Sequence, residues 1–269
     1  MYRTFTCISV VPVANQIALD LGNGSTSKSA TVLLVTIWEL GEAAGPLLIA
    51  PMSEIWGRYP VFNTANILFI SATAFAALCQ SMSPFIAARA LTGLAVASNV
   101  LNPAIVGDMF VSEQRGSPMS VIMLAPLLGG GIGPTISGAI ADVVGWRQVL
   151  WLGVCLATVC ELLFLTCFRE TYKVPILKRR AMKLRRDTGE QWRTAFDTGE
   201  SQGRTLVTSI LRPGIVLAGS GVLMLLCLFI AVGFSYYYVT AVTLPGILQD
   251  IYGLSAALTG ASLTFFSMC

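Results

Sequence analysis

Histidine is absent from this 269-residue sequence, and its absence excludes several kinds of chemistry. Without an imidazole the chain can build no His-ligated zinc site, no Ser-His-Asp triad and no histidine proton relay. Any proton transfer must therefore rest on carboxylates. No other catalytic constellation is recognisable, so we expect a protein that is not an enzyme and that needs neither a metal nor an organic cofactor.

Charged residues are also scarce. They make up 12% of the chain, whereas hydrophobic residues make up 55%, and an ordinary soluble domain is about 25% charged. A water-soluble fold of this length could not bury so much apolar surface. We therefore expect the lipid bilayer to surround most of the chain, and the long apolar runs predict an all-α polytopic membrane protein.

The cysteines give no sign of a redox or metal site. None of them belongs to a CxxC pair, and most lie inside apolar runs. A buried thiol packs like a small hydrophobic side chain, so we expect packing roles and no disulfide framework. The seven are Cys7, Cys79, Cys155, Cys160, Cys167, Cys227 and Cys269.

Several apolar stretches reach the roughly 20 residues that a spanning helix needs. The expected spans are 30–51, 61–79, 85–106, 119–144, 149–168 and 215–239. Shorter apolar segments, Thr4–Val13 and Leu254–Cys269, stand at the two ends, and we interpret them as a truncated first span and a truncated last span. A cleavable signal peptide is the alternative for the start, although its basic region and cleavage site would be poor.

Positive charge is concentrated in one connection. Eleven of the seventeen Lys and Arg residues lie between Arg169 and Arg212, where five acidic residues leave a formal charge of +6. A basic run can bind nucleic acid, but between two hydrophobic spans it predicts a cytoplasmic loop, so we expect no nucleic-acid partner. Within this loop, residues 171–187 fit either a helix at the inner headgroup layer or a disordered linker.

This placement of the loop fixes the orientation of every span. Alternation puts thirteen basic residues inside and two outside, with Arg3 and Arg89 inside spans, which satisfies the positive-inside rule. The sequon at Asn23 then lies on the outer side as a candidate glycosylation site.

The connection after the span 30–51 has an unusual composition. Residues 45–60 combine glycine, proline, one acid and one base, and Gly57 permits a tight turn. Glu54 and Arg58 could pair with each other or cap neighbouring helix ends. The segment resembles the cytoplasmic signature loop of the major facilitator superfamily, in the form found in its fungal drug–proton antiporter branch. Glu54, Gly57 and Arg58 match the acid, glycine and base of that motif.

An arginine lies inside the span 85–106. A charge within a span normally faces the bundle interior, so Arg89 needs an acidic or carbonyl partner. The alternative is an arginine near the helix end that snorkels to the headgroups. Arg89 and Gly93 resemble the Arg-x-x-x-Gly pattern of the superfamily's fourth helix, and this resemblance implies a role for Arg89 in proton coupling.

The span 119–144 carries Gly129, Gly133, Pro134 and Gly138. Gly129 and Gly133 form a GxxxG face that lets another helix approach closely, and Pro134 is expected to kink the helix. The longer Gly-x-x-x-Gly-Pro-x-x-x-Gly pattern resembles the antiporter motif of the superfamily. That resemblance implies export rather than import.

Further matches extend the resemblance over essentially the whole chain. They are Gly107-Asp108, Asp142 to Arg147 and Arg169 to Tyr172. The resemblance implies the major-facilitator fold, with twelve helices in two halves and a substrate site between the halves. We expect 1–168 to form the N-terminal bundle with a partial first helix, 169–213 the cytoplasmic central loop, and 214–269 the truncated start of the C-terminal bundle.

Three acidic residues lie inside expected spans. Glu39 and Glu42 are one helical turn apart and share a face, and Glu161 lies in the span 149–168. A carboxylate in a low-dielectric site can take up and release a proton during a cycle, so all three are candidates for proton coupling or substrate binding. The alternative is a structural hydrogen bond, which we favour for Glu42 because it adjoins the small-residue face at Gly41.

Three consecutive tyrosines, Tyr236, Tyr237 and Tyr238, end the span 215–239. They could form part of an aromatic substrate wall. An aromatic belt at the membrane interface is the simpler interpretation, and we favour it.

Together these features predict a multi-pass transporter, in the plasma membrane by resemblance, that exports a small organic compound such as a drug or a secondary metabolite. The proton gradient would drive it. Two alternatives stay open: an importer or facilitator for sugars or polyamines on the same fold, and a partial or non-functional fragment of such a transporter. The sequence indicates no oligomeric state.

Overall fold

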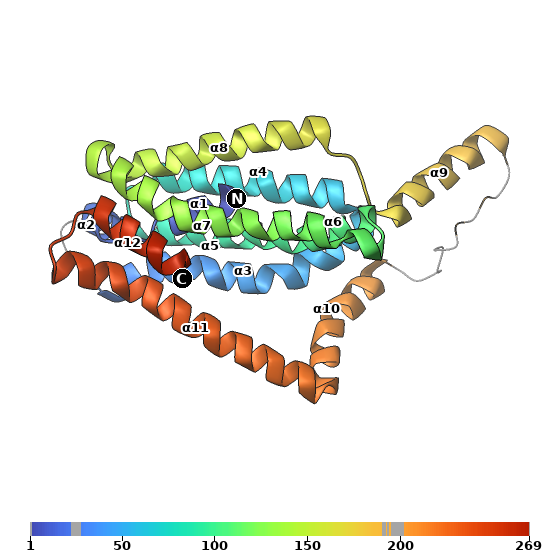
Figure 1. The fold of residues 1–269 in the computed structure, drawn as a ribbon. Coiled ribbons are helices and arrows are strands. Elements are labelled where there is room, and N and C mark those ends of the chain that lie inside the picture. Colours follow the sequence, from blue (N-terminus) through green and yellow to red (C-terminus); the bar gives the residue numbers. More distant parts are fainter. Residues whose placement is uncertain (1, 23–27, 190–191, 193, 195–201, 269) are drawn as a thin grey trace.

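The computed structural model describes residues 2–22, 28–189, 192, 194 and 202–268, and this part of the chain is built from helices without a strand (Figure 1). The α-helices are α1 (Tyr2–Ile8), α2 (Ala14–Leu21), α3 (Lys28–Trp56), α4 (Arg58–Leu78), α5 (Met82–Val96), α6 (Leu101–Met109), α7 (Gly116–Val144), α8 (Trp146–Cys167), α9 (Lys173–Thr188), α10 (Gln202–Gly219), α11 (Gly221–Asp250) and α12 (Ala256–Met268). Two short 3-10 helices, η1 (Ala97–Val100) and η2 (Ser112–Gln114), join α5 to α6 and precede α7.

Among the described residues, six helical segments are long and apolar enough to cross a membrane, which confirms the six predicted spans. They are Ser29–Trp56, Arg58–Leu78, Met82–Met109, Gly116–Val144, Trp146–Cys167 and Gly221–Asp250. The predicted start of the last span at residue 215 was wrong. The helix breaks at Ser220, between two glycines, and α11 then runs to Asp250. The hydroxyl of Ser220 caps the first turn of α11, so the new helix begins there.

The prediction of a loop over residues 45–60 was also wrong. Helix α3 continues to Trp56 and α4 begins at Arg58, so Gly57 alone leaves the helical conformation, with a φ of 104°. Pro46 and Pro51 lie inside α3, where neighbouring helices can satisfy the backbone groups that proline frees. Only glycine adopts a positive φ at low cost, so a single residue makes the whole turn.

Helices α3 and α5 approach closely through their glycines. A Cβ atom added at Gly41 would lie 2.6 Å from the carbonyl oxygen of Ala90, and one added at Gly93 would overlap the backbone carbonyl of Trp38. The small-residue face at Gly41 thus permits a close approach of the two helices. Its consequence is that Trp38 and the residues beside it are held against α5.

Helix α7 uses its small residues to pack against two different helices. An added Cβ at Gly133 would lie 3.4 Å from the ring of Phe5 in α1, whereas one at Gly138 would overlap the backbone of Ala256 in α12. Gly260 of α12 meets the carbonyl of Pro134 in the same way. Helix α12 lies along α7 in Figure 1, so the glycine-rich helix joins the start of the chain to its last described helix.

The bundle has two distinguishable ends. Helices α9 and α10 leave it at the end where Gly57 joins α3 to α4, which we name the Arg58 end, and α2 lies toward the other, the Asp20 end (Figure 1). Residues 173–188 form the helix α9. Of the two structures expected for the basic segment 171–187, a helix and a disordered linker, the helix is the one observed.

Candidate functional site

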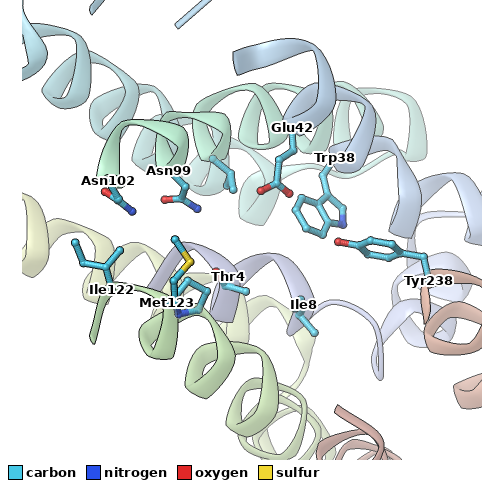
Figure 2. Close-up of a pocket in the computed structure, with 11 residues that line it drawn as sticks. Thr4, Ile8, Trp38, Glu42, Asn99, Asn102, Ile122, Met123 and Tyr238 are labelled. Atoms are coloured by element: carbon cyan, nitrogen blue, oxygen red, sulfur yellow. The ribbon is translucent and has the colours of Figure 1, made fainter. Parts of the chain in front are cut away.

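A cavity of about 250 Å³ lies inside the bundle, where α1, α3, α5 to α6, α7 and α11 converge (Figure 2). Its lining residues are Thr4, Ile8, Trp38, Glu42, Val96, Asn99, Asn102, Ile122, Met123, Pro126 and Tyr238. Mostly apolar walls with a few polar groups are typical of a site for a small organic molecule.

The polar groups of the cavity lie together. Figure 2 shows Glu42, Asn99 and Asn102 along one side, with Ile122 and Met123 facing them from α7. The side chains of Trp38 and Tyr238 close the same region at one end. One carboxylate, two amides and two aromatic rings therefore face an otherwise apolar space.

The two predicted acids of α3 have different surroundings. Glu42 lines the cavity, whereas Glu39, one turn earlier, is half-buried and is not part of its lining. Within the described part of the chain, no hydrogen bond or ion pair links another residue to the carboxylate of Glu42. The structural hydrogen bond that we favoured for Glu42 is therefore not observed, and its carboxylate faces the cavity instead.

Arg89 lies in the interior of the bundle. Its side chain is 2% exposed, which is incompatible with snorkelling toward the headgroups. Its Nη2 donates a hydrogen bond of 2.9 Å to the carbonyl oxygen of Cys7 in α1, so the partner is a carbonyl, one of the two kinds predicted. Its Nε has no hydrogen-bond partner among the described residues.

The free carbonyl of Cys7 is a consequence of a proline. Pro12 has no N–H to donate to Ile8, and the N–H of Val11 bonds to Ile8 at 3.0 Å in place of Cys7. Helix α1 therefore ends at Ile8, and the carbonyl of Cys7 loses its helical donor. Because a buried carbonyl must be satisfied, it becomes an acceptor for the guanidinium of Arg89.

A second buried arginine forms a polar network that the sequence did not predict. Arg3 is 2% exposed and donates hydrogen bonds to the side chains of Asn66 and Ser98. Asn66 in turn donates to Glu161, which is 4% exposed. The amide of Asn66 thus links the buried guanidinium of Arg3 on α1 to the buried carboxylate of Glu161 on α8. Glu161, a predicted site residue, therefore takes part in a structural hydrogen bond.

This network touches the cavity at one residue. The Nη1 of Arg3 approaches the Oδ1 of Asn99 to 3.4 Å, and Asn99 lines the cavity. A charge inside the apolar segment Thr4–Val13 or next to it is the signal that could have identified Arg3. Nothing in the sequence marks Asn66 or Asn99, because their partners lie far away in the chain.

Tyr238 corrects another expectation. The span 215–239 was expected to end at the three tyrosines, but α11 continues to Asp250, so Tyr238 lies inside the helix and lines the cavity. Tyr236 is 74% exposed and points away from the bundle. The three tyrosines therefore do not act together as an interfacial belt.

At the Arg58 end, the residues of the signature motif have separate partners. Arg58 pairs with Asp108 at 3.2 Å and donates to the hydroxyl of Ser53, so it does not pair with Glu54, which is exposed. Asp108 belongs to α6, and the ion pair therefore joins the turn between α3 and α4 to the end of α6.

Glu170 satisfies the first turn of α4 from outside that helix. Its carboxylate accepts the backbone N–H groups of Arg58 at 2.9 Å and Tyr59 at 3.2 Å, and that of Tyr172 at 3.0 Å. A Cβ at Gly57 would collide with this carboxylate. The guanidinium of Arg58 lies 4.7 Å from the ring centre of Tyr172, and burial raises the pKa of that phenol.

The remaining predicted residues lie apart from the cavity lining. Gly129, Gly133, Pro134 and Gly138 are buried in α7. Of these, Gly133, Pro134 and Gly138 make its close helix contacts. Helix α7 remains one helix through Pro134. The glycosylation site at Asn23 lies outside the described residues.

Comparison with known proteins gives a family and several relatives. The family model of the Major Facilitator Superfamily matches residues 3–269. The efflux pump radE of Floropilus chiversii is 34% identical over 238 residues, which cover 88% of this chain and 44% of the relative. The MFS-type transporter penM of Penicillium rubens is 32% identical over 259 residues, covering 96% of this chain and 50% of the relative. The chain thus spans about half the length of these fungal relatives.

Solved structures with the same fold include the human organic anion transporter TETRAN, with a TM-score of 0.66 and 18% identity over 99% of this chain and 67% of that one. A D-xylose–proton symporter matches with a TM-score of 0.64 and 16% identity, over 99% and 63% of the two chains. At these identities the likeness concerns the fold alone.

Proposed function

The chain belongs to the major facilitator superfamily, and on that premise we propose that it serves the proton-driven export of a small organic compound across the plasma membrane. The cavity of Figure 2 would hold the compound, and the acids of α3 would carry the proton. Two fungal relatives are named as an efflux pump and a transporter, and the glycine–proline pattern of α7 resembles the antiporter motif.

One observation carries this proposal: an unpaired carboxylate and a buried arginine both lie beside the broken helix α1. Glu42 lines the cavity together with Thr4 and Ile8 of α1, while Arg89 holds the carbonyl of Cys7 on the same helix. An ionised carboxylate without a partner is costly in a low-dielectric interior. A bound proton or a bound substrate would remove that cost, and this competition is the physical basis of exchange.

The proposed cycle follows from that competition. A proton that enters from the Asp20 end, which the positive-inside rule places outside the cell, neutralises Glu39 or Glu42. Compound entering from the Arg58 end displaces the proton from the cavity, and the loaded site then opens to the outside. Arg89 keeps α1 in place beside these acids through its bond to Cys7, and Glu161 remains a further candidate proton site.

The proposal predicts that Glu39→Gln and Arg89→Ala each abolish transport driven by a pH gradient. Proteoliposomes with an acidic interior should accumulate at least one of three dyes of different charge, namely ethidium, Nile red and carboxyfluorescein, through chains whose Arg58 end faces outward. A protonophore should stop the accumulation. Arg89→Lys should retain part of the rate, because an ammonium group can still donate to the carbonyl of Cys7.

The matched control is Arg169→Ala, which removes an exposed arginine outside the spans and should transport like the parent. All variants must enter the membrane in equal amounts before their rates are compared. Full activity of both Glu39→Gln and Arg89→Ala would contradict the proposal, as would dye movement that ignores the pH gradient.

A further inference from the structure

The cavity carries charge of one sign only. Glu42 is the one acidic residue among those lining it, and no lysine or arginine belongs to the lining. The ligand that would be attracted to such a cavity is a cation, because an anion would meet an unpaired carboxylate at short range.

The nearby arginines do not cancel this charge. Arg89 is not part of the cavity lining, and its guanidinium donates to the carbonyl of Cys7. Arg3 approaches the cavity from behind Asn99, but its guanidinium is occupied by the side chains of Asn66 and Ser98. Through Asn66 the guanidinium of Arg3 is also linked to the buried carboxylate of Glu161, whose charge opposes that of Arg3.

Two aromatic side chains stand beside the carboxylate. Trp38 precedes Glu42 by one turn on α3, so the two share a face, and Tyr238 lines the cavity from α11 with its hydroxyl directed toward Trp38 (Figure 2). The faces of indole and phenol rings attract cations, most strongly where water is excluded. Figure 2 shows Trp38 next to Glu42 and Tyr238 beyond Trp38. A carboxylate with two such rings at the same end of the cavity is a combination that selects a positively charged nitrogen.

The remaining walls of the cavity indicate the size and polarity of the rest of this ligand. Ile8, Ile122 and Met123 form the opposite apolar wall, and the volume of about 250 Å³ admits a compact molecule. A flat or branched hydrocarbon body would fit against this wall, with the nitrogen directed toward Glu42.

We propose that the cavity binds a compact lipophilic organic cation, with Glu42 as its counter-ion and Trp38 and Tyr238 as its aromatic walls. This assignment rests on the proposed function, because it names the class of compound for the same cavity. It departs from the anionic cargo in the name of the structural neighbour TETRAN, and it gives Tyr238 of α11 a role in specificity.

The test is equilibrium binding of two isosteric probes of opposite charge. The full chain in nanodiscs of neutral lipid is titrated with tritiated 1-methyl-4-phenylpyridinium, and 4-phenylbenzoate is the competing anion. The cation should bind saturably, and Glu42→Gln should weaken it on the order of tenfold or more. Tyr238→Leu should weaken it roughly three- to tenfold, whereas Tyr238→Phe, which keeps the ring, should bind nearly as well as the parent.

Glu113→Gln is the matched control, since it makes the same substitution at an exposed acid in η2, and it should leave binding unchanged. The proposal is overturned if the parent binds no cation saturably, if the anion competes as well as unlabelled cation, or if Glu42→Gln binds like the parent. Equal melting temperatures of the variants exclude misfolding as the cause of a loss.

The two proposals can fail separately. Saturable cation binding without any pH-gradient-driven dye accumulation would uphold the cation site and refute export. Export of Nile red or carboxyfluorescein that depends on Glu39 and Arg89, together with absent cation binding, would uphold export and refute the cation site.

Discussion

At the scale of single residues, the buried charges of Arg3, Arg89 and Glu161 are held by neutral groups of the chain rather than by direct ion pairs. Arg89 donates to a backbone carbonyl, and Arg3 reaches Glu161 only through the amide of Asn66. Burying an ion is affordable only when hydrogen bonds replace its water. These contacts therefore fix the broken helix α1 against its neighbours while leaving Glu42 free to face the cavity.

The network around Asn66 allows a sharp comparison between two asparagines of α4. Asn66→Leu removes the bridge between Arg3 and Glu161 and should lower stability by about 3 kcal/mol, because it leaves buried charges unsatisfied. Asn63→Leu makes the same change one turn earlier, where the buried Oδ1 has no hydrogen-bond partner in the described part of the chain, and it should be neutral or stabilising.

Thermal unfolding of both variants in the same detergent provides the measurement. A melting temperature that falls for Asn66→Leu but not for Asn63→Leu is the expected result. Equal melting temperatures for the two variants would show that the network contributes nothing to stability.

Single residues were only partly predictable from the sequence. Arg89 and the three intramembrane acids stand out because charges are rare inside spans. Their partners do not stand out: Asn66 and Glu161 are 95 positions apart, and Tyr238 lies on a helix whose end was misplaced. Apolar run length identifies a span, but it does not tell which side of the helix faces a cavity.

At the scale of elements, glycine contacts set the position of the cavity wall. Gly41 and Gly93 bring the backbones of α3 and α5 together beside Trp38, and Trp38 and Glu42 project from that region of α3. The Arg-x-x-x-Gly pattern thus has two physical parts, an arginine that holds α1 and a glycine that admits α3.

Gly93→Ala tests this role of the glycine. The added methyl group would overlap the carbonyl of Trp38, so α3 must shift, which should cost about 1–3 kcal/mol and weaken binding in the cavity. Gly233→Ala is the matched control in α11, where nothing lies within 4 Å of the added Cβ. It should be neutral or stabilising by up to about 1 kcal/mol.

The measurements are the melting temperatures of Gly93→Ala and Gly233→Ala and their binding of 1-methyl-4-phenylpyridinium. A Gly93→Ala chain that melts and binds like the parent would contradict the close packing of α3 on α5.

Helix ends were the least predictable feature of the elements. The prolines of α3 do not end that helix, whereas the glycine–serine sequence before α11 does interrupt a helix. In the bundle, α3 continues through Pro46 and Pro51, whereas the chain breaks at Ser220 without a proline. Turn residues predicted a loop where the membrane stabilises a helix, because neighbouring helices satisfy the freed backbone groups.

At the scale of the whole molecule, the arrangement places the glycine-rich helix α7 at a junction. It packs against α1 on one side and against α12 on the other, where the hydroxyls of Thr135 and Thr264 lie 2.5 Å apart and Asp142 accepts the backbone N–H of Ala257 at 2.9 Å. The cavity likewise draws residues from both ends of the chain, Thr4 from α1 and Tyr238 from α11. Movement of α11 relative to the other helices would therefore change the cavity directly.

The order of the helices followed from the sequence, since run lengths and the resemblance to the superfamily agree. Their spatial arrangement did not, because composition leaves open which spans touch. The contacts Arg58 to Asp108 and Arg3 to Asn66 depend on that arrangement.

The most direct test of the account is proton release on binding. The parent chain in weakly buffered detergent solution is mixed with 1-methyl-4-phenylpyridinium, and a pH indicator records the protons released as the ligand binds. The account predicts release that rises in step with the cation bound and disappears in a Glu39→Gln, Glu42→Gln double variant. Binding of the cation without proton release, or release that persists in the double variant, would contradict the exchange of proton and substrate at the acids of α3.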